Sequence, residues 1–479
     1  MPTPIPAFVN GTFRESASSA LLEARNPSDT SDLVAQVPAG SPADVVAAAE
    51  AAAQAWPAWR DLPGPGKADL LQRWANVLDA RREELAKAMV REVGKPLGEA
   101  RGEAARAVAI LRYYAGESVR NAGDVIPSQL DGTLQFTLRE PLGVVGLVTP
   151  WNFPVAIPLW KAAPAIAFGN TVVWKPSELS SECARLLCES AVEAKLPPGV
   201  LNMVPGGAAA GEALLAHPLV RAVSFTGSAK VGARVADVCS RRNVRYQTEM
   251  GGKNPAIVLA DADLGRAAAL VAGGAMRFAG QKCTATSRVL VDKKVEGPFL
   301  EALAKAVAAL PVLPPTEAAC AVGPLVQRPK VDRVRALVEA ERPRVLAGGA
   351  APAGDAFARG HFLVPTLVSD LSPASAFLTE ELFAPALAVV PVDGVDEAIA
   401  AANAVPYGLS AALFTRDLAA ALRYVRRIEA GMVRVNGDTT GVDPHAPFGG
   451  VKGSSSGSRE QGPAAREFYT ELRTVQVTP

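Results

Sequence analysis

Histidine and cysteine are scarce in this chain of 479 residues, which contains three of the first and five of the second. No two cysteines form a C-x-x-C pair, so we expect no zinc site and predict no bound metal. An odd number of cysteines in a long chain also argues against a disulfide framework and favours a reducing, cytoplasmic location.

Long hydrophobic runs and an excess of one charge are absent too. Lys plus Arg number 49 and Asp plus Glu 48, which gives no electrostatic reason to expect nucleic acid or an anionic membrane as partner. The first residues lack the basic start and apolar stretch of a signal peptide. Ala-rich segments such as 162–169 are shorter than the ~20 apolar residues of a membrane span. Hydrophobic residues make up 49% of the chain, enough for a large core.

The residues that are present follow two periodicities. Residues 42–121 repeat apolar positions at helical spacing, with a break at PGPG, 63–66. Short β-branched runs then alternate with helical segments, which predicts a doubly wound α/β architecture. The expected strands are 143–149, 171–175, 222–226, 255–259, 288–291 and 386–392, and the expected helices are 181–194, 228–240, 296–309 and 394–403.

Two α/β lobes that meet near residue 250 are the simplest arrangement for this series. A tight hairpin is expected at Asp131-Gly132, because both residues tolerate the positive φ of such turns. The segment EFYTELRTVQV (467–477) predicts a strand without a hairpin partner of its own. We expect it to pair with a distant segment, such as one of another subunit.

The G-x-G-x-x-G fingerprint of many dinucleotide sites is absent, and two weaker patterns stand in its place. Gly227 and Ser228 lie where an expected strand ends and a helix begins, where free N–H groups suit a pyrophosphate; an ordinary helix cap is the alternative. Lys175 and Glu178 follow another buried strand. Glu178 would bond ribose hydroxyls and repel a 2′-phosphate, whereas Lys175 would tolerate one; a solvated strand end explains both equally well.

Three residues are candidates for chemistry. Cys283 lies in GQKCTATSR, among small and hydroxylated neighbours that leave it reachable. Only roughly 3% of an unperturbed thiol is thiolate at pH 7, so a nucleophile needs a base or a helix N-terminus nearby. Glu249, before paired glycines in QTEMGGKNP, is a candidate base, with a surface Glu as the alternative. Asn152, in PWNFP, could direct its amide at an oxyanion, with a polar turn residue as the alternative.

Seven motifs together resemble the aldehyde dehydrogenase superfamily over essentially the whole chain: PWNFP, KPSE, FTGS, E-x-G-G-K-N-P, GQKC, EELF and PFGG occur in its order and spacing. The resemblance implies two doubly wound α/β lobes, one a Rossmann-like cofactor domain and the other a catalytic domain, plus a β-hairpin oligomerisation arm that builds a homodimer or homotetramer. The implied boundaries are 1–121 and 142–252 for the cofactor domain, 253–465 for the catalytic domain, and 122–141 and 466–479 for the arm.

The resemblance also implies residue roles in oxidising an aldehyde to an acid through a cysteine thioester. Cys283 is the nucleophile, Glu249 the general base, and Asn152 forms the oxyanion hole with the Cys283 backbone N–H. The cofactor is NAD, with NADP as the alternative. The residues expected to contact it are Trp151, Lys175, Glu178, Gly227, Ser228, Glu381 and Phe383.

Two positions depart from the family pattern. Ala384 stands where relatives usually have Gly, and Met250 where Leu is common. We expect neither to abolish activity, although Ala384 is expected to stiffen or shift the loop beside the cofactor.

The C-terminal run and YQTEMGGKNP look most like the α-ketoglutaric semialdehyde (2,5-dioxopentanoate) dehydrogenases. That substrate carries a carboxylate, and Arg106 is predicted to bind it, with a solvated helix arginine as the alternative. Phe153, Trp160 and Phe448 are predicted to line the same tunnel. Succinic semialdehyde and aromatic aldehyde dehydrogenases are the alternatives, and Trp160, where the succinic class commonly has Arg, speaks against the first.

Two functions of other classes remain to be weighed. A cofactor-independent thiol esterase could use Cys283 and Glu249 alone, but it would leave the Lys175–Glu178 and Gly227–Gly232 features without a purpose. A non-catalytic structural protein would bind the cofactor without needing the cysteine and its base.

Overall fold

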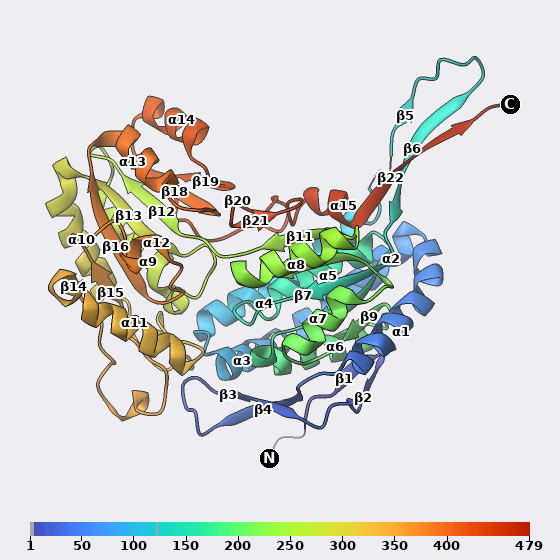
Figure 1. The fold of residues 1–479 in the computed structure, drawn as a ribbon, viewed down its shortest axis with the longest axis horizontal. Helices are drawn as coiled ribbons and strands as arrows, with labels where there is room; N and C mark the ends of the chain where they lie inside the picture. The colour runs from blue at the N-terminus through green and yellow to red at the C-terminus, as the bar shows by residue number, and fades with distance from the viewer. Residues whose placement is uncertain (1–3, 121–122) are drawn as a thin grey trace.

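The computed structural model describes residues 4–120 and 123–479, so the expected boundary between residues 121 and 122 lies outside the described residues. Two α/β lobes lie side by side, and a narrow arm projects from one of them (Figure 1). The predicted fold class of two doubly wound lobes is confirmed. In the described part of the chain, no helix combines the length and apolar character needed to cross a membrane.

The first lobe contains an eight-stranded sheet in the order β2-β1-β9-β8-β7-β10-β11-β21. The five strands from β9 to β11 in this order are parallel to one another. The β-branched, buried sequences of β7, β8 and β10 predicted these three as parallel strands, whereas β9 and β11 were not predicted. The chain builds outward from β7 through β8 to β9 and then returns to add β10 and β11 on the other side. Bounds are β1 (Ala7–Val9), β2 (Thr12–Arg14), β7 (Val144–Val148), β8 (Thr171–Lys175), β9 (Leu201–Met203), β10 (Val220–Thr226), β11 (Arg245–Glu249) and β21 (Ser455–Ser456).

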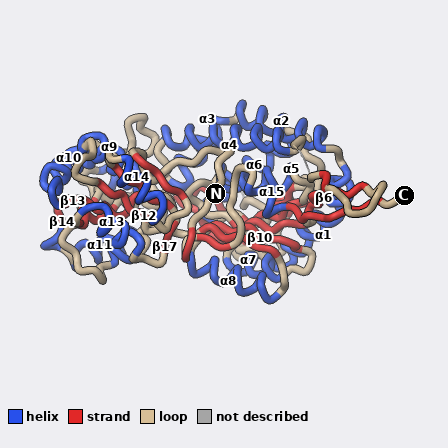
Figure 2. Tube along the Cα trace, turned by 90° about the horizontal axis from the view of Figure 1, so that it is seen from above, coloured by secondary structure: helices blue, strands red, loops and turns tan. Residues whose placement is uncertain are grey.

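Helices cover both faces of this sheet. Figure 2 shows α7 and α8 on one face and α2 to α5 on the other, and the buried side chains form a separate core against each face. Bounds are α1 (Pro42–Asp61), α2 (Gly64–Ala80), α3 (Arg82–Val93), α4 (Leu97–Glu117), α5 (Ala156–Ala167), α6 (Ser181–Glu193), α7 (Ala208–Ala216) and α8 (Ala229–Arg241). The break expected over 63–66 is shorter, because proline is tolerated in the first turn of a helix and α2 therefore begins at Gly64. A hairpin of β3 (Leu21–Arg25) and β4 (Leu33–Pro38) precedes α1.

The second lobe contains a seven-stranded sheet in the order β14-β15-β16-β13-β12-β18-β19. Because β11 ends at Glu249 and β12 begins at Asn254, the chain passes between the lobes near residue 250, as predicted. Strand bounds are β12 (Asn254–Val258), β13 (Thr286–Asp292), β14 (Val345–Ala347), β15 (Thr366–Val368), β16 (Ala386–Val392), β18 (Ser410–Phe414) and β19 (Met432–Val435). Helix bounds are α9 (Leu264–Met276), α10 (Glu296–Ala308), α11 (Arg328–Ala340), α12 (Ala376–Thr379), α13 (Gly394–Asn403) and α14 (Leu418–Arg427). The strand β21, within the segment expected to form the catalytic domain, pairs instead with β11 of the first sheet.

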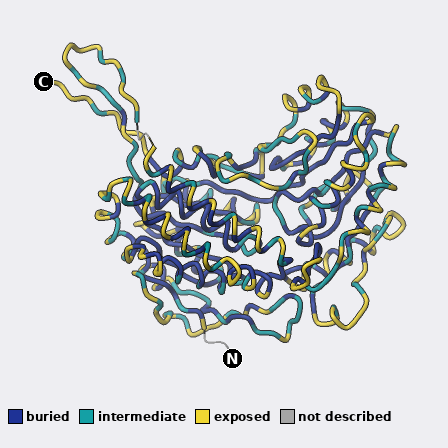
Figure 3. Tube along the Cα trace, turned by 180° about the vertical axis from the view of Figure 1, so that it is seen from behind, coloured by how far each residue is buried: buried dark blue, intermediate teal, exposed yellow. Residues whose placement is uncertain are grey.

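The arm is a three-stranded antiparallel sheet of β5 (Val125–Ile126), β6 (Leu134–Pro141) and β22 (Thr470–Val477). The predicted hairpin is present, since β5 and β6 pair and a turn closes at Asp131-Gly132, where the Thr133 N–H donates to the Leu130 carbonyl oxygen. The prediction of a tight connection is wrong: only Gly132 has a positive φ, of 67°, and the loop runs from the end of β5 at Ile126 to the start of β6 at Leu134. Figure 3 shows that most of the arm is exposed.

The terminal strand differs from the prediction in two ways. It begins only at Thr470, because residues 464–469 form the helix α15 (Ala464–Tyr469). Its partner is distant in sequence but belongs to the same chain: β22 pairs with β6 from Thr470 opposite Pro141 to Val477 opposite Leu134.

Candidate active site

Four of the predicted site residues lie at the carboxyl ends of neighbouring parallel strands. Asn152 follows β7, Lys175 ends β8, Gly227 follows β10 and Glu249 ends β11. These strands are adjacent in the order β8-β7-β10-β11, so their ends share one edge of the sheet. The chain reverses its direction of sheet growth between β7 and β10, and doubly wound sheets bind ligands at such a point.

Cys283 lies in the loop between the short helix η2 (Arg277–Gly280) and β13. Phe278, Ala279 and Gly280 have φ values of 55°, 53° and 67°. Left-handed backbone is costly for the first two, and burial of their side chains holds them there. A Cβ at Gly280 would overlap the carbonyl oxygen of Ala384. Packing therefore determines the path of the loop that carries the thiol.

The Cys283 side chain is half-buried, whereas the other four cysteines are buried. Burial, followed by the carboxylates of Glu381 and Glu249, raises the pKa of the Cys283 thiol to about 12. The thiol is therefore protonated at neutral pH, and its use as a nucleophile requires a proton acceptor.

Asn152 is buried and is tied to the loop that carries the cysteine. Its Nδ2 donates a hydrogen bond of 2.9 Å to the backbone carbonyl oxygen of Gln281. Asn254 fixes the same loop from the other lobe, since its Nδ2 donates to the carbonyl oxygens of Cys283, at 2.8 Å, and Ala285, at 2.9 Å. A carboxamide has two N–H donors, so one donor of Asn152 remains for a ligand.

Glu249 is buried at the end of β11 with one oxygen satisfied and one not. Its Oε2 accepts a hydrogen bond of 2.6 Å from Ser455 Oγ, while Oε1 has no partner among residues 4–120 and 123–479. Burial first, and then the carboxylate of Glu460, raise the pKa of Glu249 well above its ordinary value. A carboxyl group of this kind exchanges its proton closer to neutral pH than a surface glutamate does.

A buried ion pair stands behind Glu249. Lys161 on α5 pairs with Glu460, and both side chains are at most 2% exposed. Glu460 also accepts a hydrogen bond of 2.9 Å from Trp160 Nε1, and Lys161 donates one of 2.8 Å to Ser224 Oγ. After burial, which has the largest effect, the Glu460 carboxylate raises the pKa of Glu249 and the Lys161 ammonium lowers it, so this pair contributes to the pKa of the base.

One cavity of about 700 Å³ brings together the thiol and the predicted substrate residues. The rings of Trp160 and Phe448 lie 5.6 Å apart between their centroids. Arg106, on α4, donates from Nη1 to the carbonyl oxygen of Val442 at 2.5 Å. The predicted residues that line this cavity are Arg106, Phe153, Trp160, Cys283 and Phe448.

Trp151, Glu381 and Phe383, three of the predicted cofactor residues, do not line the cavity of Cys283. The rings of Trp151 and Phe383 meet edge to face, with centroids 5.8 Å apart. Burial raises the pKa of Glu381 to about 7, and its Oε1 accepts a hydrogen bond of 3.2 Å from the backbone N–H of Gly252. A Cβ at Gly251 would overlap the Glu381 carboxylate, so a larger residue at position 251 would displace that carboxylate.

The strand ends offer the donors that a dinucleotide needs. Thr226 Oγ1, at the end of β10, is buried and has no hydrogen-bond partner in the described part of the chain. The exposed Ser228 caps α8, and the buried Lys175 Nζ donates to the Pro176 carbonyl oxygen at 2.9 Å. Glu178 is half-buried beside it. A buried hydroxyl is costly unless a ligand or water satisfies it, so these groups fit the phosphates and ribose hydroxyls of a dinucleotide.

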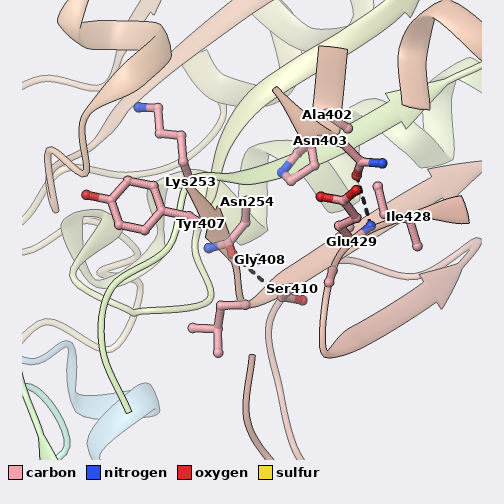
Figure 4. A pocket seen from close by; sticks show the side chains of 13 residues that line it. Lys253, Asn254, Ala402, Asn403, Tyr407, Gly408, Ser410, Ile428 and Glu429 are labelled. Carbon is pink, nitrogen blue, oxygen red and sulfur yellow. Dashed lines mark hydrogen bonds between the residues drawn. The ribbon is translucent and has the colours of Figure 1, made fainter. Parts of the chain in front are cut away.

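A small pocket beside Lys253 and Asn254, drawn in Figure 4, has no room for substrate. Its volume is about 10 Å³, which is space for one water molecule at most. Lys253 and Tyr407 are among its lining residues, and Asn254 Oδ1 accepts from the Ser410 backbone N–H at 3.0 Å. Burial, followed by the charge of Arg288, lowers the pKa of Lys253 to about 7.

The model of the aldehyde dehydrogenase family matches residues 13–475, which is nearly the whole chain. The chain belongs to the aldehyde dehydrogenase family. It is 43% identical to an α-ketoglutaric semialdehyde dehydrogenase of Bacillus subtilis, over 98% of both chains. It is 40% identical to an α-ketoglutarate semialdehyde dehydrogenase of Haloferax volcanii, over 99% of both. Among solved structures, an NAD-dependent aldehyde dehydrogenase of Sinorhizobium meliloti superposes with a TM-score of 0.95 at 35% identity, over 100% of this chain and 95% of the other.

The prediction of an NAD(P)-dependent aldehyde dehydrogenase is confirmed by this membership. The enzyme uses a nicotinamide dinucleotide to oxidise an aldehyde. Neither the thiol esterase nor the structural protein accounts for a match of this extent.

Sequence reasoning missed two features of this aldehyde dehydrogenase. The first is the Lys161–Glu460 pair, although a lysine inside the apolar helix AIPLWKAAPAIA was a usable signal, since a buried charge needs a partner. The second is Arg277, which lines the cavity of Cys283 and is exposed. Its guanidinium has no hydrogen bond or ion pair with any described residue, whereas Lys282 beside it pairs with Glu99 at 2.8 Å.

Proposed function

We propose that the protein oxidises α-ketoglutaric semialdehyde to 2-oxoglutarate, with NAD as the cofactor and a thioester on Cys283 as the intermediate. The single observation that carries this proposal is the cavity of about 700 Å³, where the thiol shares the walls with two guanidinium groups, Arg106 and Arg277. A substrate with an aldehyde at one end and a carboxylate at the other suits both features. The two relatives named for this aldehyde support the same choice.

The proposed first step is addition of the Cys283 sulfur to the aldehyde carbon, after the Glu249 carboxylate has accepted the thiol proton and passed it to solvent. The free N–H of Asn152 and the backbone N–H of Cys283 stabilise the oxyanion that forms. The bound dinucleotide supplies the acceptor for the hydride that leaves the same carbon, so that an acyl thioester remains on the sulfur. The residues proposed to hold it are Trp151, Lys175, Glu178, Gly227, Ser228, Glu381 and Phe383.

Hydrolysis of the thioester is assigned to Glu249. Its buried Oε1, without a protein partner, accepts a proton from a water molecule, which then attacks the acyl carbon and releases the acid and the thiolate. The Glu460 carboxylate supports this role because it raises the proton affinity of Glu249.

The distal carboxylate is proposed to bind between Arg277 and Arg106. Arg106 keeps its predicted role, but one of its donors is engaged by the Val442 carbonyl. Arg277, which has no hydrogen bond or ion pair with any described residue, is therefore the stronger of the two anchors. Phe153, Trp160 and Phe448 are proposed to enclose the carbon chain.

Cofactor preference, assembly and location complete the proposal. The Glu178 carboxylate disfavours a 2′-phosphate, so we propose NAD, with NADP as the alternative through Lys175. All five cysteines are free, which supports a cytoplasmic location. The arm supports a homodimer or homotetramer.

The test is a direct assay that follows the absorbance of reduced nicotinamide in the presence of the protein, NAD and α-ketoglutaric semialdehyde. The wild-type protein is expected to reduce NAD in this assay. In the Cys283→Ala variant, the rate of NAD reduction is expected to fall by roughly a thousandfold. Ester cleavage without NAD reduction would instead support the thiol esterase, and silence in both assays would support the structural role. A panel that adds succinic semialdehyde and an aromatic aldehyde, with NAD and NADP, ranks the alternatives by kcat/KM.

A further inference from the structure

A second cavity, of about 190 Å³, lies at the root of the arm and shares no lining residue with the cavity of Cys283. Its walls come from the end of α1, the start of α2, the end of α4, and the arm strands β6 and β22. In the described lining, Glu117 is the single carboxylate. The cationic side chains that line the cavity are Arg60, Lys67, Arg120, Arg139 and Arg466.

Glu117 compensates only one of these charges. Its carboxylate is 2% exposed and is shared by Arg466, at 3.0 Å, and Arg120, at 2.5 Å. Arg466 also lies over the ring of Phe168, 5.7 Å from its centroid. Two guanidinium groups against one carboxylate leave one positive charge in excess at this wall.

The other two arginines are paired with carboxylates that do not line the cavity. Arg139 binds Glu467 at 2.5 Å, and Arg60 binds Asp61 at 2.7 Å. Each of these two pairs has no net charge. The Arg139 guanidinium also donates a hydrogen bond of 3.3 Å to Thr470 Oγ1, between the arm strands β6 and β22.

Lys67 has no carboxylate partner among the described residues. It is only 7% exposed, and its Nζ donates to the carbonyl oxygens of Arg60, at 3.0 Å, and Leu62, at 2.6 Å. Burial lowers the pKa of this ammonium, and only the more distant charge of Asp61 opposes that effect. A buried ammonium has three N–H donors and is costly without a counter-ion, so its third donor and its charge are left for a ligand.

The start of α2 adds positive potential to the same cavity. This helix spans 17 residues, and its N-cap Pro63 makes no side-chain capping bond. Gly64, in the first turn, lines the cavity. The partial positive charge of an uncapped helix N-terminus favours an anion in front of it.

We propose that this cavity binds a small oxyanion of the phosphate or carboxylate class between Lys67, Arg120 and the start of α2. Lys67 contributes one uncompensated positive charge, and the two arginines that share Glu117 contribute a second. The ligand is therefore expected to be an anion. Arg139 and Thr470 of the arm strands line the same cavity, so the anion would bind at the junction between the arm and the lobe.

The experiment titrates the full-length protein with inorganic phosphate and, separately, with 2-oxoglutarate, at constant ionic strength, by isothermal titration calorimetry. Saturable binding to the wild type is expected, with Kd raised about tenfold or more in Lys67→Met and in Arg120→Gln, since each removes a charge-assisted contact. Arg120 is 66% exposed, so its variant keeps the fold intact if Lys67→Met fails to fold. Arg426→Gln, an exposed arginine on α14, is the matched control and should bind as the wild type does.

The two titrants distinguish the sources of the anion. Tighter binding of phosphate that Lys67→Met and Arg120→Gln both weaken assigns the cavity to a phosphate group, and tighter binding of 2-oxoglutarate that the same two variants weaken assigns it to a carboxylate. Phosphate that binds only at the proposed cofactor site, or 2-oxoglutarate that binds only in the cavity of Cys283, would show the same Kd in all four proteins. That result, or the absence of saturable binding by both titrants, overturns the proposal without touching the proposed oxidation of the aldehyde.

Discussion

Glu249 and Glu460 illustrate how single residues tune this enzyme. The Glu249 carboxyl has a buried oxygen without a hydrogen-bond partner in the described part of the chain. The Glu460 carboxylate raises the pKa of Glu249 more than the Lys161 ammonium lowers it. The sequence does not reveal the effect of Glu460 on Glu249, because the two residues are far apart in the chain. A base and the groups that shift its pKa need to be close only in space.

Replacing Glu460 with Gln should therefore lower the pKa of Glu249. The deprotonated base then forms at lower pH, so the ascending limb of the kcat–pH profile should move to lower pH than in the wild type. Pre-steady-state bursts of reduced nicotinamide identify the pH range in which thioester hydrolysis limits kcat. The exposed Glu301 on α10 supplies the control Glu301→Gln, whose profile should not move. A profile of Glu460→Gln that stays in place, or moves to higher pH, contradicts the assignment.

The contributions of Arg277 and Arg106 to carboxylate binding can be distinguished by comparing KM for an acidic and a neutral aldehyde. Arg277→Met should raise KM for α-ketoglutaric semialdehyde by roughly ten- to a hundredfold, the range of a charge-assisted hydrogen bond of about 1.5–3 kcal/mol. Arg106→Met should have a smaller effect, because one of its donors already binds the Val442 carbonyl. A neutral aliphatic aldehyde should show unchanged KM in both variants. Equal losses for the neutral and the acidic aldehyde would rule out carboxylate binding.

At the scale of elements, the strained turn η2 decides where the thiol lies. Its left-handed residues precede Cys283, and Ala384 of the cofactor-side loop packs its carbonyl against Gly280. The expected effect of Ala384 on that loop stays a prediction. Because Gly280 and the Ala384 carbonyl are in contact, a substitution in the turn η2 is expected to shift the loop beside the cofactor, and the reverse.

Gly280→Ala should destabilise the protein by about 2 kcal/mol or more and should abolish most activity, since its Cβ would overlap the Ala384 carbonyl in a backbone region that favours glycine. Thermal unfolding and kcat measure the two effects. Gly297 on α10 is the matched control, because a Cβ there meets nothing within 4 Å. If both glycine variants unfold at the same temperature, the proposed strain at Gly280 is refuted.

Most of the long elements could be predicted from local patterns. Buried parallel strands are rich in β-branched residues, so β7, β8, β10, β13 and β16 stood out. The strands β1, β2, β14 and β15, at or next to an edge of their sheets, escaped prediction because three residues carry no periodicity. The helix α15 was taken as strand because a short aromatic segment has no clear period of its own.

At the scale of the whole molecule, the arm exposes more apolar surface than a lone chain is expected to leave in water. Its exposed large residues lie on a three-stranded sheet whose edges have no partner among the described residues. Native sheets rarely leave such edges free, so we expect a second copy of the chain to cover the arm. These residues are Val125, Leu130, Leu134, Leu138, Leu472 and Val477.

Leu472→Glu should lower the molecular mass of the assembly, because it places a charge on this surface. Light scattering after size-exclusion chromatography measures the change. Leu418 on α14 is 72% exposed, compared with 59% for Leu472, and Leu418→Glu should leave the mass unchanged. An assembly of the same mass in the wild type and both variants would contradict the role of the arm.

The sequence by itself determined the family, the alternation of strands and helices, and the candidates Cys283, Glu249 and Asn152, because each is encoded in a few consecutive residues. Only the tertiary structure decided the partner of β22, the Lys161–Glu460 pair, and the position of the Arg277 guanidinium in the cavity of Cys283. These depend on contacts between segments far apart in the chain. Their energies come from burial and charge in the folded state, which no local pattern records.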